Sequence, residues 1–283
     1  MFLARFSKSL LICKPNNSPK CRNLIDQFRY FSTNTNQTHF GFETVSEKEK
    51  EERVYQVFHN VADKYDLMND VMSAGIHRLW KDCFIKSVGP ISDTNLLDVA
   101  GGTGDISFRY LQYLKNSSKS ATVTVLDINQ AMLNVGRDKA KSKGFQNEIT
   151  WVQGNAENLP FSENQFDVYT VAYGIRNMTH IDKVLKEAYR VLKPGGRFAC
   201  LEFSRVDNFF LRNLYDNYSF HIIPVMGKLI AGDYKSYKYL VESIRQFPDQ
   251  ETFSEMIEEA GFSNVNHENL MFGVSAIHSG FKI

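Results

Sequence analysis

The sequence predicts an α/β protein built on a mostly parallel sheet, and three features predict it. Strand-like runs alternate with helix-like segments from residue 95 to residue 203, an alternation typical of parallel strands joined by right-handed crossovers. A turn with three glycines, Gly101-Gly102-Thr103-Gly104, links the first of these strands to the first helix. A second β-branched run ends in Asp127. Ligands of such sheets bind at the carboxyl ends of the strands, where both features fall.

The individual elements follow from apolar periodicity and from breaker residues. We predict strands at residues 95–100, 122–127, 149–153, 166–172 and 196–203, and helices at residues 105–114, 130–143 and 181–192. Helical spacing also predicts helices at residues 54–65 and 76–84, with a break at residues 66–70 between them. Near the C-terminus, Asp249 is expected to cap a helix that Gly261 ends. Residues 264–271 and 274–283 are expected to form a terminal hairpin.

The glycine turn differs from the two common phosphate-binding turns. A dinucleotide-binding turn has a third glycine where this chain has Ser107, and a P-loop has Gly-Lys-Ser/Thr where Asp105 follows Gly104. An acidic residue at the mouth of the turn would repel a phosphate. The turn therefore favours a nucleoside ligand without phosphates, and a cationic one fits the acidic residue.

Two further positions fit a nucleoside. Asp127 ends the second strand, where a carboxylate accepts hydrogen bonds from both hydroxyls of a ribose. Asn155 and Ala156 follow the third strand, and an asparagine amide there can pair with an adenine edge. The alternative is that these residues only cap helices and shape turns, which becomes harder to sustain for all of them in this order.

Longer strings extend the comparison from a ligand class to a family. Residues 98–105, Asp127, residues 155–156 and residues 193–196 resemble the class I S-adenosylmethionine-dependent methyltransferases. The strings at residues 58–70, 173–177 (YGIRN), 189–196, 215–221 and 239–245 resemble the ubiquinone/menaquinone biosynthesis C-methyltransferase family. The resemblance runs from about Val54 to Ile283, and its specific part includes strings outside the cofactor-binding fold.

The resemblance implies a cofactor, a reaction and an acceptor. It implies the Rossmann-like class I fold, a seven-stranded, mostly parallel sheet with helices on both faces. It also implies S-adenosyl-L-methionine bound at six residues: Gly102, Thr103, Gly104, Asp127, Asn155 and Ala156. It implies methylation of a ring carbon of 2-methoxy-6-polyprenyl-1,4-benzoquinol, a step toward ubiquinone. No metal is expected, because the sulfonium already carries its leaving group.

Transfer to a ring carbon needs an electron-rich ring, so a group that removes or stabilises the charge of a ring hydroxyl is expected. Histidine is the common general base near neutral pH, so His221, which lies in an aromatic stretch, is a candidate, and Tyr65 is a further one. Arg176 is not a neutral base, but it can stabilise a phenolate or orient a water. A structural role for His221 remains at least as good an interpretation.

The N-terminal segment differs in charge from the rest of the chain. Residues 1–40 hold six basic residues and one acidic residue, whereas the whole chain has a formal charge of +1. We interpret them as a mitochondrial transit peptide with its linker, and residues 46–283 as the methyltransferase domain. Because the remaining chain is net acidic and has no basic stripe, we do not expect it to bind nucleic acid.

Residues 205–248 form an apolar and aromatic insertion that the sheet does not require. We expect it to contribute to the substrate site, to a homodimer contact or to a membrane-facing surface, with core packing accounting for part of it. No apolar run is long enough to span a membrane. We therefore expect a peripheral protein on the matrix face of the inner membrane, associated with other subunits of a ubiquinone-biosynthesis complex.

Three other functions remain as alternatives. An NAD(P)-dependent reductase is disfavoured by Ser107 and by the acidic turn. A catalytically dispensable assembly subunit of a quinone-biosynthetic complex is disfavoured by the intact cofactor residues. A methyltransferase of another apolar aromatic acceptor is compatible with the residues, which leave the ring unspecified.

Overall fold

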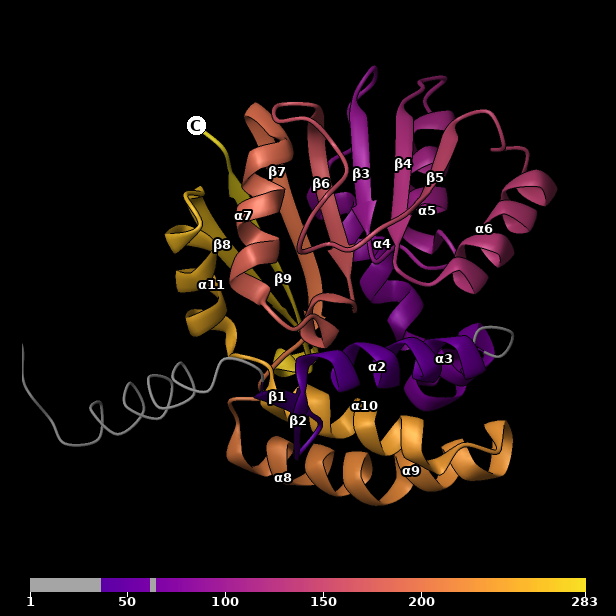
Figure 1. The fold of residues 1–283 in the computed structure, drawn as a ribbon, viewed down its shortest axis with the longest axis vertical. Coiled ribbons are helices and arrows are strands. Elements are labelled where there is room, and N and C mark those ends of the chain that lie inside the picture. Colours follow the sequence, from indigo (N-terminus) through magenta and orange to yellow (C-terminus); the bar gives the residue numbers. More distant parts are fainter. Residues whose placement is uncertain (1–36, 62–64) are drawn as a thin grey trace, which may run out of the picture. The chain divides into compact units, whose positions relative to one another are not determined.

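The computed structural model describes residues 37–61 and 65–283, with the side chains of residues 59–66 left out of that description. The predicted transit segment therefore lies almost wholly outside the described residues. A seven-stranded sheet with the order β5-β4-β3-β6-β7-β9-β8 forms the centre of the domain (Figure 1). Strand β9 runs antiparallel to both of its neighbours, β7 and β8, and all other neighbouring strands of the sheet are parallel. The predicted mostly parallel sheet of seven strands is confirmed.

The strands and their connecting helices lie close to the predicted ranges. The strands are β3 (Asn95–Val99), β4 (Thr122–Asp127), β5 (Ile149–Gln153), β6 (Phe166–Ala172), β7 (Leu192–Phe203), β8 (Ser263–Leu270) and β9 (Ser275–Phe281). The helices between them are α5 (Asp105–Lys115), α6 (Gln130–Lys143), α7 (Ile181–Val191) and α11 (Gln250–Glu259). The carboxylate of Asp249 accepts the backbone N–H of Thr252 and so caps α11, as predicted.

The sheet carries a separate core on each face because successive strand side chains alternate between faces. Leu96 packs with α5 and with α4 (Ile76–Val88) on one face, whereas Leu97 and Val99 pack with α7 and α11 on the other. Figure 1 shows α7 and α11 in front of the sheet and α4 and α5 behind it. Helices on both faces are thus confirmed.

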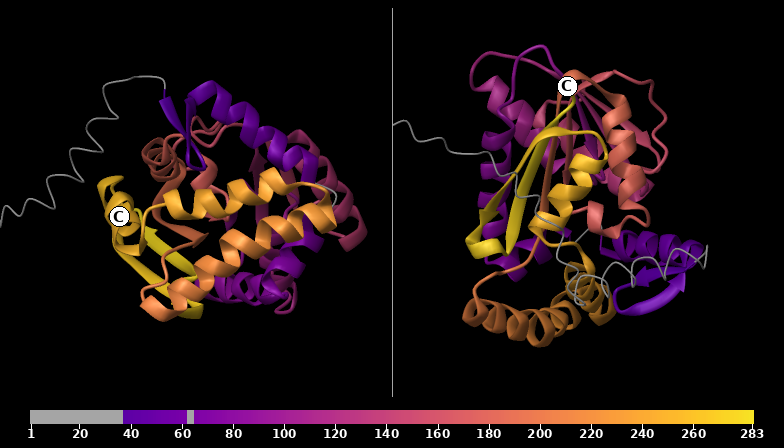
Figure 2. Two further views of the ribbon diagram at one scale, coloured as in Figure 1. Left: turned by 90° about the horizontal axis from the view of Figure 1, so that it is seen from below. Right: turned by 90° about the vertical axis from the view of Figure 1, so that its left-hand side faces the viewer.

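The remaining helices gather near the carboxyl ends of the parallel strands (Figures 1 and 2). Before the sheet come β1 (Gln37–Phe40), β2 (Glu43–Ser46), α2 (Glu47–Val61) and α3 (Tyr65–Ser73). After β7 come α8 (Phe209–Asn217), η3 (Tyr218–Ile222), α9 (Ile223–Met226), η4 (Gly227–Ala231) and α10 (Tyr234–Gln246). A third buried cluster joins α3 to this second group through Met68, Ile223, Tyr237 and Val241.

Two predictions about this end of the chain need correction. The break expected at residues 66–70 is wrong, because these residues lie inside α3. The helix expected from Val54 begins earlier, at Glu47, where Glu47 and Glu49 in its first turn favour the positive end of the helix dipole. None of the helices in the described part of the chain is both long and apolar enough to cross a membrane.

Candidate active site

The turn after β3 opens a cavity at the carboxyl ends of β3, β4 and β6, which we call the glycine-turn cavity. It holds about 1230 Å³ of free space, including its opening to solvent, and Gly102 and Thr103 line it. Gly102 adopts a left-handed backbone (φ 55°), which glycine tolerates best. Gly104, also predicted to contact the ligand, is not among the lining residues. A Cβ at Gly104 would lie 2.7 Å from the indole of Trp151, so this glycine allows close packing behind the turn.

Ser107, which stands in place of a third glycine, has a structural partner. Its hydroxyl donates to Asp98 (2.7 Å), and Thr170 donates to the other oxygen of that carboxylate (3.0 Å). Burial raises the pKa of Asp98 to about 6, although these hydrogen bonds oppose the shift. A buried side-chain network, rather than a close glycine contact, thus joins the start of α5 to β3 and β6.

Asp127 lies in the glycine-turn cavity and is held by the backbone. Its two oxygens accept the N–H groups of Gly102 (2.9 Å) and Asn129 (2.8 Å). Burial raises the pKa of Asp127 to about 6, and the backbone hydrogen bonds oppose that shift. The carboxylate is therefore ionised at neutral pH and held at the wall of this cavity.

The segment after β5 forms the next part of the wall. Asn155 and Ala156 line the cavity, as does Glu157. The Asn155 side-chain oxygen accepts the N–H of Glu157 (2.9 Å), while the Glu157 carboxylate accepts the N–H groups of Thr179 (2.9 Å) and His180 (3.0 Å). The structure thus brings five of the six predicted cofactor residues to one cavity.

Helix α2 covers this cavity, with Val54, Tyr55 and Phe58 facing the ligand space. Two hydrogen bonds fasten it, from Asn129 Nδ2 to the carbonyl of Tyr55 (3.3 Å) and from Lys50 Nζ to the carbonyl of Met178 (3.0 Å). Burial lowers the pKa of Lys50 to about 8. Helix α2 is therefore held over the cavity by specific hydrogen bonds as well as by packing.

A second, more apolar cavity adjoins the first, and we call it the aromatic cavity. It holds about 1050 Å³ of free space, including its opening. Its walls come from α2, α3, α4, the ends of β6 and β7, and the insertion, including Trp80, Phe203, Tyr215, Tyr218, Tyr237 and Tyr239. Such a cavity fits an apolar, ring-bearing ligand.

Four residues line both cavities: Phe58, Lys81, Tyr173 and Asn177. Tyr173 adopts a left-handed backbone (φ 57°), which is unfavourable for a bulky residue and is retained where surrounding structure enforces it. Its hydroxyl lies 3.2 Å from Ser275 Oγ, and its ring packs on Phe203. The junction of the two cavities is thus formed by a strained, well-supported strand end.

Arg176 lines the aromatic cavity from η2 (Ile175–Asn177), and its guanidinium is almost fully buried. It donates to Glu202 (2.9 Å), to the carbonyl of Tyr173 (2.5 Å) and to Ser243 Oγ (3.3 Å). Burial raises the pKa of Glu202, and the Arg176 charge opposes that rise. The pair therefore fixes a cation at the wall of the aromatic cavity.

The other two predicted catalytic residues have different positions. His221 lies in η3, is exposed and lines neither cavity, so the structure does not bring it to the site. Tyr65 begins α3, but its side chain lies outside the described residues. The histidine that lines the aromatic cavity is His77 of α4, which sequence reasoning missed, although it lies one turn before Lys81 in a periodic apolar segment.

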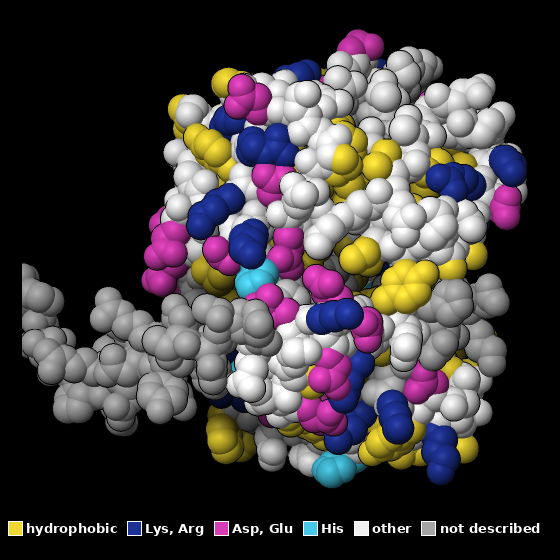
Figure 3. Space-filling model, viewed as in Figure 1, with side chains coloured by type: hydrophobic (Ala, Val, Ile, Leu, Met, Phe, Trp, Pro, Cys, Tyr) yellow, Lys and Arg dark blue, Asp and Glu magenta, His cyan; other side chains and the backbone are white. Residues whose placement is uncertain are grey.

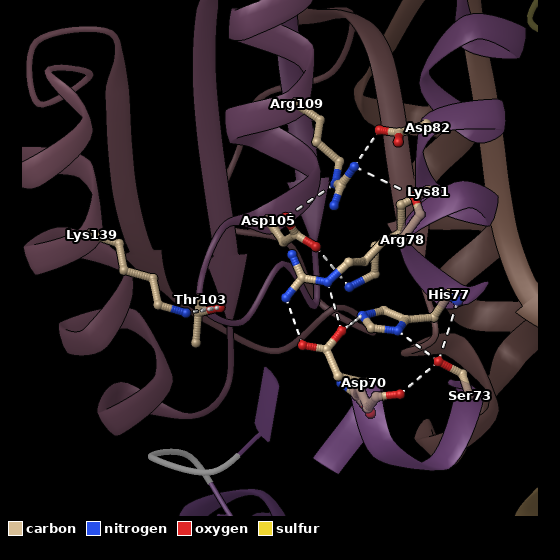
Figure 4. Close-up of polar contacts among 11 residues, drawn as sticks. Asp70, Ser73, His77, Arg78, Lys81, Asp82, Thr103, Asp105, Arg109 and Lys139 are labelled. Atoms are coloured by element: carbon tan, nitrogen blue, oxygen red, sulfur yellow. Dashed lines mark hydrogen bonds and ion pairs between the residues drawn. The ribbon is translucent and has the colours of Figure 1, made fainter. Parts of the chain in front are cut away.

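His77 and Lys81 belong to a polar network between α3, α4 and α5 (Figure 4). The His77 ring contacts Ser73 Oγ (2.8 Å) and the Asp70 carboxylate (3.8 Å), and burial lowers its pKa to about 4. Lys81 pairs with Asp105 at 2.8 Å. The acidic residue of the turn is thus neutralised by the protein, which weakens the inference of a cationic ligand from Asp105 alone.

Figure 4 also shows the outer part of this network. Arg109 pairs with both Asp105 and Asp82, and Lys139 reaches Thr103 Oγ1 at 3.3 Å. Among the described residues there is no cluster of three or more histidine, cysteine or acidic side chains arranged to hold a metal ion.

Comparison with known proteins decides the class of the site. A family model described as the ubiE/COQ5 methyltransferase family matches residues 46–282. The chain belongs to this family. It is 56% identical over 277 residues to the mitochondrial 2-methoxy-6-polyprenyl-1,4-benzoquinol methylase of Bos taurus, covering 87% of this chain and 84% of the relative. It is 57% identical over 272 residues to the protein of the same name from Dictyostelium discoideum, covering 87% of each.

A solved structure supports the fold independently of the close relatives. An S-adenosylmethionine-dependent methyltransferase from Thermotoga maritima superposes with a TM-score of 0.57 at 19% identity, covering 81% of this chain and 99% of that one. Fold and family membership together make this member of the ubiE/COQ5 family a class I, S-adenosylmethionine-dependent methyltransferase.

Proposed function

We propose that this enzyme transfers a methyl group from S-adenosylmethionine to a ring carbon of 2-methoxy-6-polyprenyl-1,4-benzoquinol. The observation that carries the proposal is the junction of the two cavities at Tyr173 and Asn177, beside an aromatic cavity whose lining is mostly apolar. The relatives at 56% and 57% identity are named for that acceptor. The reaction places the protein in ubiquinone biosynthesis.

The cofactor would occupy the glycine-turn cavity. Asp127 accepts the ribose hydroxyls, the backbone at Gly102 and Thr103 faces the methionine end, and Asn155 and Ala156 lie at the adenine. This placement directs the sulfonium toward Tyr173 and Asn177, where the aromatic cavity begins. Gly104 acts behind the turn by giving space to Trp151.

The chemistry is an in-line displacement, in which the protein contributes orientation and a site shielded from water. The ring carbon would form a bond to the methyl carbon while the electron pair of the carbon–sulfur bond stays on sulfur, and the proton of that ring carbon would then pass to water. Arg176 stabilises negative charge on a ring hydroxyl oxygen as the ring becomes nucleophilic. Tyr65 stays a further candidate at the acceptor, with its side chain outside the described residues.

The deciding experiment is a methyl-transfer assay with short-tailed 2-methoxy-1,4-benzoquinols and purified protein, with the product analysed by NMR. We expect a new ring-carbon methyl group. Methylation of oxygen, or turnover only on hydrophilic acceptors, would overturn the acceptor assignment. A protein that binds S-adenosylmethionine but turns over only when other biosynthetic subunits are added would instead support the assembly-subunit alternative.

The insertion would give the long polyprenyl tail a route out of the protein. Phe209, Phe210 and Leu214 of α8 and Leu229 of η4 are exposed, and hydrophobic side chains appear at the lower edge of the view in Figure 3. Burying each methylene of the tail contributes about 0.8 kcal/mol, so a tail of many isoprene units gains from staying in a lipid phase. We therefore place this surface on the matrix face of the mitochondrial inner membrane.

Two measurements address location. N-terminal sequencing of the mitochondrial protein should find a start within about residues 30–40, and a start at Met1 would refute the transit-peptide interpretation. Flotation with cardiolipin-containing vesicles should recover the wild type and lose a Phe209→Ser/Phe210→Ser variant. If instead the variant floats normally but changes its sedimentation coefficient, the surface is a homodimer or complex contact.

A further inference from the structure

Two side chains of α10 reach the segment that carries Arg176. Tyr239 and Ser243 lie one helical turn apart, which places them on the same face of the helix. The Tyr239 hydroxyl donates to Asn177 Oδ1 at 2.9 Å, and Ser243 Oγ accepts from Arg176 Nε at 3.3 Å. One face of an insertion helix therefore holds Asn177 of the junction and its neighbour Arg176 in the aromatic cavity.

Asn177 has an amide nitrogen that its surroundings do not satisfy. The residue is only 8% exposed, and no partner for Nδ2 exists among the described residues. A buried amide N–H without an acceptor is costly, so such a group is expected to have a hydrogen-bond partner. Asn177 lines both cavities, and that partner can therefore come from a bound molecule.

The hydrogen bond from Tyr239 sets which end of the amide is left without a partner. Burial raises the pKa of Tyr239 well above its usual range, so its hydroxyl keeps its proton. That hydroxyl donates to the oxygen of Asn177, which leaves the NH₂ group as the unpartnered end of a side chain that lines both cavities. The Tyr239 ring is itself held by stacking on Phe40, with ring centroids 4.0 Å apart.

We propose that Asn177 donates a hydrogen bond to a ring oxygen of the methyl acceptor, and that Tyr239 is the positioning residue that orients it for this contact. Ser243 plays the matching part for Arg176. The acceptor ring then meets a neutral donor and a cation from adjacent residues, which fixes the ring relative to the sulfonium. This inference rests on the proposed function for the identity of the acceptor, whereas the Tyr239–Asn177 contact does not.

The test compares Tyr239→Phe, which keeps the ring and its stacking, with Tyr234→Phe, a matched control on an exposed tyrosine of the same helix. In Tyr239→Phe we expect kcat/KM for a short-tailed methoxyquinol to fall between about threefold and tenfold, with unchanged affinity for S-adenosylmethionine. Tyr234→Phe should match the wild type. The side-chain amide signals of Asn177 in ¹⁵N-labelled protein should shift only in Tyr239→Phe.

A double-mutant cycle separates positioning from a general structural effect. If Tyr239 acts through Asn177, the double variant Tyr239→Phe/Asn177→Ala should be no slower than Asn177→Ala alone. Additive losses, or unchanged Asn177 amide signals in Tyr239→Phe, would overturn the inference. A failure of the proposed function would give a different result. Wild-type protein that does not turn over methoxyquinols would overturn the acceptor assignment, whereas the Asn177 amide signals would still test the Tyr239–Asn177 contact.

Discussion

The two cavities are built in different ways. The glycine-turn cavity takes its main polar features from four consecutive strand ends, with backbone N–H groups holding Asp127. The aromatic cavity is assembled from side chains of α2, α3, α4, the ends of β6 and β7, and α8 to α10. The glycine-turn cavity therefore depends on the sheet, whereas the aromatic cavity depends on the helices that pack at the end of the sheet.

That difference separates cofactor binding from acceptor choice. The Thermotoga maritima structure shares the fold at 19% identity, so the sheet recurs in a chain of very different sequence. Under the proposed function, the acceptor is recognised by the helices at the mouth of the cavities, because these supply most of the aromatic lining. Variants in the two cavities should therefore change different kinetic constants.

The largest effect is expected at Arg176. Arg176→Lys keeps the charge opposite Glu202 but loses the planar set of donors that reach Glu202, Tyr173 and Ser243. We expect kcat for methoxyquinol methylation to fall by about 10²–10³-fold, the range for loss of one preorganised donor. The affinity for S-adenosylmethionine, measured by calorimetry, should stay within about twofold.

A matched control is Arg137→Lys on α6, a half-buried arginine outside both cavities that hydrogen-bonds to Asn134 and to the carbonyl of Trp151. It should retain wild-type kcat. Full kcat in Arg176→Lys, or equal losses of cofactor affinity and turnover, would contradict the assignment of cofactor binding and acceptor recognition to separate cavities.

The separation also explains which parts of the site the sequence could predict. Gly102, Thr103, Asp127, Asn155 and Ala156 each lie at the end of a predicted strand, so local patterns place them in one cavity. Gly104 was predicted by the same pattern, but its role depends on Trp151, which lies 47 positions later in the sequence and packs beside it only in the folded sheet.

The aromatic cavity was predicted only as an apolar insertion. Which of its residues face inward depends on packing between α3, α4 and α10, and no periodic pattern distinguishes exposed His221 from buried His77. Asn177 was within a family string next to Arg176, but its unpartnered amide is visible only after Tyr239 has been placed.

The next effect, in the glycine-turn cavity, is expected at Asp127. Asp127→Ala should weaken S-adenosylmethionine binding by about 1.5–3 kcal/mol, which corresponds to roughly 10–150-fold in the dissociation constant. Asp138→Ala on the exposed face of α6 is the matched control and should bind normally. Unchanged calorimetry for Asp127→Ala would show that the ribose is held elsewhere.

The same carboxyl predicts how cofactor binding depends on pH. Burial raises the pKa of Asp127 to about 6, so below that pH the free protein carries a proton that must leave before the carboxylate can accept the ribose hydroxyls. The binding constant should fall by up to tenfold per pH unit below about pH 6. The same carboxyl affects the free energy of unfolding in the opposite direction. Because its pKa is higher in the folded than in the unfolded protein, its contribution to stability increases as the pH falls.

Binding calorimetry at pH 5, 6 and 7, with Asp127→Asn as the comparison, tests the expected pH dependence of cofactor binding. The asparagine variant should bind weakly at every pH and without the decline seen in the wild type. A wild-type binding constant that is flat from pH 7 to pH 5 would contradict the ionised-carboxylate role.

The smallest effect distinguishes the two histidines. His77 lines the aromatic cavity, and burial lowers its pKa to about 4, so it is neutral at pH 7. We expect His77→Gln to raise KM for the methoxyquinol by about threefold to tenfold, because it changes one buried polar contact in the wall. His221→Gln, at an exposed position outside both cavities, should keep kcat and KM within about twofold. A large loss of kcat in His221→Gln, with wild-type rates in His77→Gln, would mean that the acceptor binds on the outer face of the insertion, and the aromatic cavity would then lose its role.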